Sequence, residues 1–511
     1  MPKQTQKKPE LESESDQSLY AAIDLGSNSF HIIIAREVHG QMQVVDKHKE
    51  MVRLRSGLDK NGKLTDKAFH AGIECLKRFG QLIKGIPALN VRAVGTNTLR
   101  NARNSHEFLI QAKQALGHTI KIISGQEEAR LIYLGVVHGL PASDEQRLVM
   151  DIGGGSTEYI IGKGFENSHL TSTEMGCVSI MQSYFPKGKI TTERMNTAIS
   201  QCRQVLRPHR IQLKNLSWDT AIGASGSIKS IGQILELNAW SESGITLAGM
   251  QKLAAALIKA ESADTLKLEG LKDERRPVLV GGLAILMATF MELGIQQMQV
   301  SANALREGLV FDTLGRRHSE DVREVSVSAM QQWMRVDTQQ ATHVAKTAQA
   351  LFKQAHNTWK LRSTDYDLKR LLKWASMLHE CGIAISYRRY RHHSAYLIEQ
   401  ADMPGFDQQE KQMLSAMMLN HRGKFNASVY DDLDETTAEQ QIYLTVLLRL
   451  AVRIHRGRDF EQADPLLCIK NKNHIHLEFE ENWLQDHPLT RLDLEIEAKR
   501  LNAIGLKLSL E

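Results

Sequence analysis

Cysteine is scarce and scattered in this chain. The 511 residues include five cysteines, an odd number, and none of them forms a CxxC pair. Disulfide frameworks and thiolate zinc sites need paired or clustered cysteines, so both are excluded as organising features. The pattern is typical of a protein from a reducing compartment, and we therefore expect a cytoplasmic location.

Long apolar segments are also lacking. Met1 to Ser18 is polar and charged, which argues against a signal peptide or a membrane span there. The longest apolar run, residues 278–291, contains two glycines and is shorter than the roughly 20 residues of a membrane helix. We expect a disordered tail over residues 1–18, a buried helix over 278–291 and no transmembrane segment, which leaves peripheral membrane association open.

Neither sign of charge dominates. The formal net charge is +5, and a content of 42% hydrophobic and 24% charged residues is typical of a soluble globular protein. Because so mild a positive charge tolerates polyanions without requiring them, we expect no nucleic-acid partner. The length exceeds one ordinary core and predicts two to four domains.

Two familiar phosphate-binding motifs are absent. The chain has no GxxxxGK[ST] sequence and no GxGxxG that opens a helix after a strand, which disfavours Walker-type ATPases and Rossmann dehydrogenases. "GASGSIKS" (Gly223 to Ser230) lacks the Walker spacing, but its glycines and hydroxyl residues follow the strand-like "DTAIG". It suits a phosphate-binding turn and an ordinary strand-to-helix loop equally well.

The predicted secondary structure changes in character twice along the chain. Strand-like and helical segments alternate from Leu19 to about Leu314, which predicts an α/β architecture, and residues 317–456 are nearly continuous helix before strand patterns return. In the first part, "AAIDLGSNSF" and "LVMDIGGGST" share a plan of strand, Asp, aliphatic residue, Gly and small hydroxyl residues. Their aspartates, Asp24 and Asp151, lie 127 residues apart, which suggests two similar lobes facing each other across a cleft.

"DIGGGSTE" has the clearest chemical pattern. Three glycines let backbone N–H groups surround a phosphate because no Cβ stands in the way, and two hydroxyl residues add donors. These residues are Gly153, Gly154, Gly155, Ser156 and Thr157. Asp151 and Glu158 supply oxygen ligands for a hard cation such as Mg2+. The alternative explanation is a tight β-hairpin.

Further charged residues follow other predicted strands. "SGQEEARL" places Glu127 and Glu128 where a helix begins. Either they stabilise the helix N-terminus through its dipole, or one of them deprotonates a water that attacks phosphorus. Arg100 in "GTNTLRNARN" is either a phosphate clamp or a solvated helix residue.

Seven motifs, in order and spacing, resemble the exopolyphosphatase/guanosine pentaphosphate phosphohydrolase family. They are "DLGSNSFH", "GTNTLR", "ISGQEEARLIYLGV", "DIGGGSTE", "MGCVS", "GASGSIK" and "ALREGL". The resemblance implies an α/β, actin-like ATPase (ribonuclease H-like), two-lobed N-terminal half, a mostly helical HD-like domain and a small mixed C-terminal domain. The domains expected are lobe I over 19–131, lobe II over 132–316, the HD-like domain over 317–425 and the α+β domain over 426–511.

The resemblance also implies roles for individual residues. Glu128 matches the family's catalytic base, and Asp151 and Glu158 match its magnesium-site acids. The matches to phosphate-contacting positions are Ser27, Asn28, Arg100 and Gly153 to Thr157. "SANALREG" departs from the family, which often has glycines before "ALREG", so the role of this segment stays open. Mg2+, K+ as a second cation and a homodimer are expectations of the same kind.

The expected activity is that of an exopolyphosphatase, which releases orthophosphate from the end of inorganic polyphosphate by Mg2+-assisted attack of water. The alternative is hydrolysis of the 5′ γ-phosphate of guanosine pentaphosphate (pppGpp) to give ppGpp, since the same site chemistry serves both substrates. Two other classes stay open, an actin-like sugar kinase or ATPase and a non-catalytic alarmone-binding regulator.

The helical half resembles an HD-type phosphohydrolase domain. Its signals are His343, His379-Glu380, His392-His393 and His421. An HD metal centre has a His-Asp pair, and Glu380 in place of the Asp lengthens that ligand by a methylene, which favours a structural domain over a metal site. "YRRYRHH" (Tyr387 to His393) suits either a guide for a long polyanion or a solvated basic surface.

Overall fold

The computed structural model describes residues 18–38, 41–141, 143–317, 321–431, 433–458 and 465–511. The predicted tail therefore lies outside the described residues, except for Ser18. The chain divides into two compact units, Met1–Ser319 and Glu320–Glu511. All five cysteines are free thiols, as their scatter predicts. The finer boundaries at residues 131 and 425 stay predictions.

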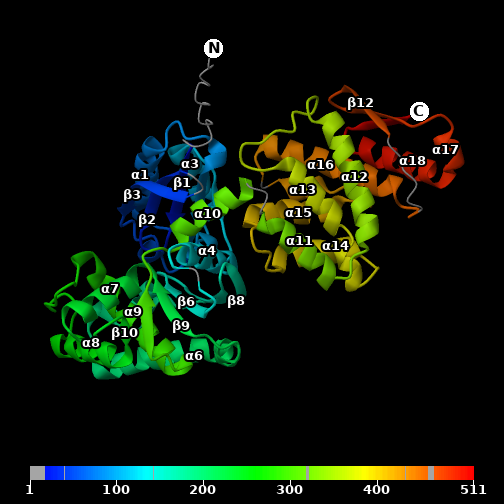
Figure 1. Ribbon diagram of the computed structural model, residues 1–511. Helices are drawn as coiled ribbons and strands as arrows, with labels where there is room; N and C mark the ends of the chain where they lie inside the picture. The colour runs from blue at the N-terminus through cyan, green and yellow to red at the C-terminus, as the bar shows by residue number, and fades with distance from the viewer. Residues whose placement is uncertain (1–17, 39–40, 142, 318–320, 432, 459–464) are drawn as a thin grey trace, which may run out of the picture. The chain divides into compact units, whose positions relative to one another are not determined.

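The first unit begins with a five-stranded sheet in the order β3-β2-β1-β4-β5 (Figure 1). Its strands are β1 (Leu19–Leu25), β2 (Phe30–Val38), β3 (Gln41–Glu50), β4 (Val91–Gly95) and β5 (Ile120–Ile122). Strands β1 and β2 form an antiparallel hairpin, and β4 runs parallel to β1 on its other side. We call this sheet and its helices lobe I.

A six-stranded sheet, the centre of lobe II, repeats this plan. Its order is β10-β11-β9-β6-β7-β8, built from β6 (Gln146–Ile152), β7 (Thr157–Lys163), β8 (Glu166–Thr173), β9 (Thr220–Ala224), β10 (Ile245–Thr246) and β11 (Gln297–Val300). The hairpin β6–β7 corresponds to β1–β2, and β9 runs parallel to β6 as β4 does to β1. The predicted duplication around Asp24 and Asp151 is confirmed.

Helices cover the sheets of both lobes. Lobe I carries α1 (Asp66–Leu82), α2 (Asn97–Asn101) and α3 (Ser105–Leu116), and lobe II carries α5 (Cys177–Tyr184), α6 (Thr192–Asn215), α7 (Ser225–Leu237), α8 (Leu247–Ala260) and α9 (Arg276–Leu293). Helix α1 buries Ile73, Leu76 and Phe79, whose spacing of three residues puts them on one face of the helix. Helix α3 ends where Gly117 adopts a left-handed conformation (φ 80°), which glycine tolerates.

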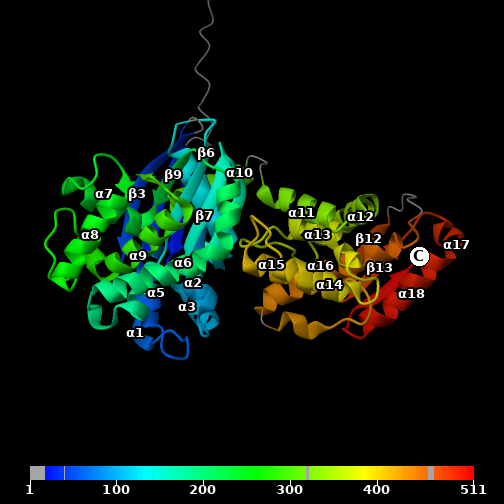
Figure 2. The ribbon, with the colours of Figure 1, turned by 90° about the horizontal axis from the view of Figure 1, so that it is seen from below.

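Helix α9 is the most apolar segment of the chain. By length and composition alone, residues Asp273–Leu293 would suit a membrane span, and they are the single such candidate in the part of the chain that the structure describes. However, 83% of the apolar window is buried. Figure 2 shows α9 with α5 and α6 on one side of β6 and β7, so it is the buried core helix that the sequence predicts.

Two helices join the lobes. Helices α4 (Gly125–His138) and α10 (Leu305–Arg317) contribute to one buried cluster that also contains residues of both sheets. Their crossing is close because each supplies a glycine. A Cβ on Gly135 would lie 2.0 Å from the carbonyl oxygen of Ala304, and one on Gly308 would lie 1.8 Å from that of Leu131. This packing fixes the first turn of α4 beside the gap between the lobes.

The second unit is helical with a small sheet. Its helices are α11 (Val322–Trp333), α12 (Thr338–Ala355), α13 (Leu368–Leu378), α14 (Tyr390–Gln400), α15 (Gln408–Asn420), α16 (Glu435–Ile454), α17 (Trp483–Asp486) and α18 (Pro488–Asn502). The three-stranded sheet contains β12 (Leu466–Asn471), β13 (His474–Glu478) and β14 (Lys507–Leu510). Helices α16 and α18 are joined by a fully buried ion pair between Arg449 and Glu497, with N and O atoms 2.5 Å apart. The predicted helical stretch and the return of strands are both confirmed.

Candidate active site

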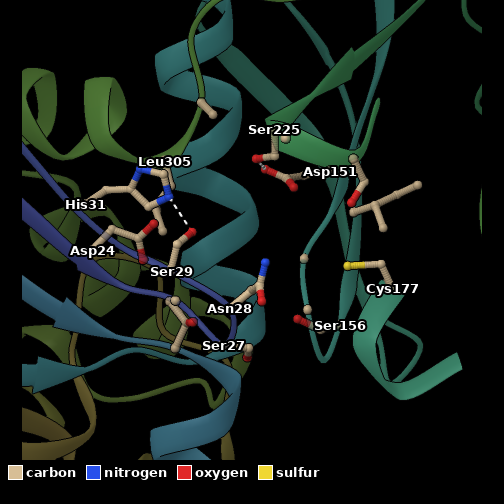
Figure 3. A pocket seen from close by; sticks show the side chains of 18 of the residues that line it. Asp24, Ser27, Asn28, Ser29, His31, Asp151, Ser156, Cys177, Ser225 and Leu305 are labelled. Atoms are coloured by element: carbon tan, nitrogen blue, oxygen red, sulfur yellow. Dashed lines mark hydrogen bonds between the residues drawn. The ribbon is translucent and has the colours of Figure 1, made fainter. Parts of the chain in front are cut away.

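A cavity of about 260 Å³ lies between the two lobes (Figure 3). Lobe I contributes the turn after β1, and lobe II contributes the turn after β6 and the first turn of α7. Asp24, Ser29 and His31 lie on one side, and Asp151 and Ser225 on the other. The two halves of the internal repeat therefore face each other across one cleft, as the sequence predicts.

The strand registers place the acids of each hairpin. Asp151 and Glu158 are directly opposed in the β6–β7 ladder, and Asp24 is opposed to His31 in the β1–β2 ladder. Asp151 also accepts a hydrogen bond of 2.5 Å from Ser225 Oγ. Ser225 has a φ of 62°, a strained conformation for a residue other than glycine, which is common at functional sites. The strand ends thus hold these carboxylates in fixed positions.

The three glycines of the β6–β7 turn have a more specific role than the sequence suggests. Gly153 and Gly154 line the cavity. A Cβ on Gly154 would lie 2.8 Å from Ser27 Cβ, and one on Gly155 would lie 2.2 Å from Asn97 Oδ1. Part of the room that glycine provides is therefore taken by lobe I and not by a ligand. The segment is also a β-hairpin, so the alternative explanation from the sequence describes its backbone correctly.

Glu128 reaches the cavity from the first turn of α4. Ser124 caps this helix by accepting a hydrogen bond from the backbone N–H of Glu127. Glu128 is only 7% exposed and lines the cavity, and its Oε2 has no hydrogen-bond partner among the described residues. Glu127 differs completely, because it forms a buried two-bond ion pair with Arg130 at 2.8 and 2.9 Å. Glu127 is therefore held in an ion pair, whereas Glu128 lines the cavity with an oxygen that has no hydrogen-bond donor among the described residues.

Four buried carboxylates are gathered at the cleft. Burial raises the pKa of Asp24 to about 7 and that of Asp151 to about 6. Burial and then the charge of Asp151 raise the pKa of Glu158 to about 8, and burial and then the charge of Glu158 raise the pKa of Glu128 well above its ordinary value. Like charges in a buried site repel each other, so the cluster favours a proton or a cation.

The same cavity is lined by four basic side chains, Lys49, Lys229, Arg275 and Arg306. Sequence reasoning did not single them out, although Lys229 lies in "GASGSIKS" and Arg306 in "ALREGL". Gly226 admits Arg275, since a Cβ there would lie 2.0 Å from its guanidinium. Basic groups and acids that line one cavity suit a polyanion that carries a divalent cation.

The remaining predicted phosphate ligands divide into two groups. Ser27, Asn28 and Ser156 line the cavity. Arg100 and Thr157 are not among its lining residues. Arg100 donates to the carbonyl of Ile123 at 2.5 Å and lies 3.7 Å from Glu128 Oε2, and Thr157 donates to the carbonyl of Met175. In this conformation Arg100 Nη1 and Thr157 Oγ1 are used within the protein.

The carboxylates of the cleft are ligands of the kind that Mg2+ prefers. No cluster of three or more metal-ligating side chains occurs within the described ranges. Mg2+ does not need one, since it binds through one or two carboxylates together with water and substrate phosphates. Among the described residues, Asp24 Oδ1 and Glu128 Oε2 are buried without hydrogen-bond donors, so the cleft has carboxylate oxygens that no donor satisfies. Glu158 lies just behind the lining, with Oε1 accepting from Ser172 Oγ at 2.9 Å.

Comparison with known proteins identifies the family. A family model described as "Ppx/GppA phosphatase family" matches residues 33–317, and one described as "Ppx/GppA phosphatase, domain III" matches residues 322–498. The chain belongs to the Ppx/GppA phosphatase family. It is therefore a phosphohydrolase that acts on phosphoanhydride bonds, which confirms the class expected from the seven motifs.

Individual relatives of the Ppx/GppA family match most of the chain. Proteins from Aeromonas hydrophila subsp. hydrophila and Photobacterium profundum, both named guanosine-5'-triphosphate,3'-diphosphate pyrophosphatase, are 39% and 38% identical over 487 and 493 residues. These alignments cover 95% and 96% of this chain and 97% and 98% of the relatives. The crystal structure of a Cytophaga hutchinsonii exopolyphosphatase has a TM-score of 0.54 at 23% identity, covering 58% of this chain and 98% of the other. The actin-like, two-lobed fold is confirmed.

The histidines of domain III are only partly brought together. The rings of His379 and His421 have centroids 5.6 Å apart, whereas His343 lies beside His455 at 6.0 Å. Arg458 Nη2 donates to both carboxylate oxygens of Glu380, at 2.7 and 2.8 Å. The oxygen atoms that a metal would use are occupied by a guanidinium, which supports a structural role for this HD-like region.

Acid should destabilise domain III through these histidines. Burial and then the charge of His379 lower the pKa of His421 well below its ordinary value, and burial also lowers that of His379. The unfolded chain binds protons at these histidines below pH 6.5 and the folded chain does not, so stability falls as the pH drops below 6.5, by up to about 1.4 kcal/mol per pH unit for each.

Amide hydrogen exchange of α13 and α15 between pH 7.5 and 5 measures this loss, after correction for intrinsic rates. We expect the opening free energy of these helices to depend less on pH in His421→Gln than in the native chain. This difference in slope does not depend on how stable the variant is at pH 7.5. Identical slopes for the two proteins would show that His421 is not the source of the acid sensitivity.

The basic segment "YRRYRHH" includes a residue with a clear structural function. Arg391 Nη1 donates to the carbonyls of Leu419 and Arg422, both at 2.9 Å, and so satisfies the end of α15. Tyr390 OH accepts from Arg422 at 3.0 Å. These bonds weaken the interpretation of the segment as a guide for a long polyanion.

Proposed function

We propose that this chain hydrolyses the 5′-terminal phosphate of guanosine-5'-triphosphate,3'-diphosphate, releasing orthophosphate and ppGpp. The full-length relatives that are named for this substrate support the choice of substrate. The observation that carries the chemistry is the buried carboxylate of Glu128, which lines a cavity with basic side chains and whose Oε2 has no hydrogen-bond partner among the described residues.

This proposal reverses the order expected from the residues alone. Sequence reasoning placed inorganic polyphosphate first, partly because "YRRYRHH" resembles a track for a long chain. The bonds of Arg391 take one of the basic side chains out of such a track, while Arg388 and Arg389 stay exposed. The two substrates need the same terminal chemistry, so polyphosphate is the natural competitor in any assay.

In the proposed mechanism the terminal phosphate lies between the turns of the two lobes. Ser27 and Asn28 from lobe I and the backbone of Gly154 from lobe II hold its oxygens, while Arg275 and Arg306 balance its charge. Glu128 accepts a proton from the water that attacks phosphorus. The bond from phosphorus to the bridging oxygen breaks, and that oxygen leaves with the nucleotide diphosphate end. Positioning and electrostatics supply most of the acceleration in such loose phosphoryl transfer.

Asp151 and Glu158 would hold Mg2+ at this site. When bound, Mg2+ supplies charge neutralisation at the phosphate oxygens. Asp151 is oriented for this by Ser225, and Glu158 by Ser172. A cation beside these acids would also relieve the repulsion that raises their pKa values.

A direct comparison of substrates tests the proposal. One purified sample is given pppGpp and long-chain polyphosphate at equal concentrations of terminal phosphate, and orthophosphate release is followed with Mg2+ present. We expect a higher kcat/KM for pppGpp, with ppGpp as the second product. A higher kcat/KM for polyphosphate would instead support the exopolyphosphatase expected from the sequence. Absence of release from both substrates would contradict the proposal and favour a non-catalytic binding protein.

A further inference from the structure

Three side chains form a hydrogen-bonded row beside the cavity. Arg306 Nη1 lies 3.1 Å from His31 Nδ1. His31 Nε2 in turn lies 2.8 Å from Ser29 Oγ, the bond that Figure 3 shows as a dashed line. The row runs from the start of α10 to the turn before β2, and all three residues line the cavity. It connects the "ALREG" segment, whose role the sequence left open, to the turn after β1.

Arginine fixes the direction of every hydrogen bond in this row. A guanidinium only donates, so His31 Nδ1 must accept and carries no hydrogen. The neutral ring then has its hydrogen on Nε2, and this N–H donates to Ser29 Oγ. Ser29 Oγ therefore accepts this hydrogen bond, and the single hydrogen of its hydroxyl group does not point toward His31. No other hydrogen-bond partner of Ser29 Oγ is found among the residues that the structure describes.

The ring of His31 is neutral, as it must be for Nδ1 to accept a hydrogen bond from Arg306. Burial lowers its pKa well below the ordinary value, and so do the charges of Arg306, Lys49, Arg275 and Lys229, in that order. An imidazolium would also present an N–H to the guanidinium N–H of Arg306. The neutral Nε2–H form is thus favoured by charge and by hydrogen bonding.

We propose that His31 is a positioning residue that, oriented by Arg306, directs the Ser29 hydroxyl hydrogen into the cavity to donate to a phosphate oxygen of the substrate. The neighbouring Ser27 has the same arrangement, because its Oγ accepts from Thr98 Oγ1 at 2.7 Å. Phosphate oxygens at neutral pH are chiefly acceptors, so a hydroxyl already turned to donate needs no reorganisation when the substrate binds. The inference rests on the proposed function only in taking a phosphoanhydride as the ligand.

Four variants separate positioning from simple packing. Ser29→Ala removes the donor, and His31→Asn keeps an acceptor for Arg306 but is too short to donate to Ser29. His31→Gln is long enough to restore that donation. His48→Asn, on the exposed face of β3, is the matched control, since His48 bonds only to Asp46 among the described residues.

The expected result is strong coupling between His31 and Ser29. Each of Ser29→Ala and His31→Asn should lower kcat/KM and the affinity for inorganic tripolyphosphate by about 10- to 100-fold, the usual effect of losing a hydrogen bond to a charged group. The double variant should be no worse than Ser29→Ala alone. His31→Gln should recover most of the loss, and His48→Asn should match the native protein.

Calorimetric binding of tripolyphosphate makes the test independent of hydrolysis. If the two losses multiply in the double variant, if His31→Gln is as poor as His31→Asn, or if the native protein does not bind tripolyphosphate, the positioning role is wrong. If coupling is found in binding but pppGpp is not hydrolysed, the proposed function fails and the positioning role stands. Nitrogen-15 shifts of the His31 ring, assigned with His31→Gln, should show a protonated Nε2; a protonated Nδ1 would overturn the inference.

Discussion

Glu128→Gln should lower the rate of phosphate release by about 100- to 10,000-fold, the range expected when a general base is lost. Binding of pppGpp should change little, because an amide occupies the same space and this side chain does not balance the charge of the phosphates. The same substitution should raise the unfolding temperature at pH 8. It removes a buried carboxylate whose pKa is raised by burial and by Glu158, and which is therefore ionised at a cost.

Glu127→Gln is the matched control, one residue away on the same helix turn. Although burial opposes it, Arg130 and then Arg92 hold the pKa of Glu127 below its ordinary value. Loss of this ion pair should lower the free energy of unfolding by about 1.5 to 3 kcal/mol, with a much smaller effect on kcat. Stopped-flow phosphate release and thermal unfolding measure both quantities. If Glu128→Gln loses binding and stability together, Glu128 is structural and the mechanism is wrong.

Asp151→Asn should reduce kcat by at least about 100-fold at saturating Mg2+, since the loss of charge stabilisation by a bound metal is worth several kcal/mol. It should also raise the Mg2+ concentration needed for half-maximal activity. Mg2+ should increase the unfolding temperature of the native protein, more at pH 8 than at pH 6, because at pH 6 Glu158 is largely protonated and Asp151 is about half protonated. The variant should lose most of that increase.

Asp219→Asn is the control for charge alone. Asp219 directly precedes β9, at the end of β6 that is opposite to Asp151. Its carboxylate accepts a hydrogen bond from the backbone N–H of Gln146. We expect an unchanged Mg2+ dependence and a small change in unfolding temperature. If Asp151→Asn shows the same Mg2+ dependence as the native protein, the cation binds elsewhere.

The sequence predicted what local patterns and repetition determine. The shared plan around Asp24 and Asp151 predicted two matching lobes, and the five strands of the first sheet have the same order as five of the six strands of the second, β10 being the additional one. The apolar run over residues 278–291 predicted a buried helix, and α9 is buried along nearly all of that run. Glu128 was predicted from the motif, and its place in the cavity agrees with the role proposed for it.

What the sequence did not predict depends on contacts between distant segments. Arg306 reaches His31 across 275 positions of the chain, and no pattern in either segment indicates the other. Gly155 packs closely against Asn97 of the other lobe. From the sequence alone, this reason for a glycine could not be distinguished from a role in phosphate binding. Likewise, Arg458 lies 78 residues from Glu380, and only the fold shows that it takes both carboxylate oxygens.

Hydrolysis of pppGpp in water enriched in oxygen-18 tests the central claim most directly, that a water in this cleft attacks the terminal phosphorus. Mass spectrometry of both products after a single turnover shows where the label goes. We predict one oxygen-18 atom in the orthophosphate and none in ppGpp. Label in the terminal phosphate of ppGpp, or unlabelled orthophosphate, would contradict the account.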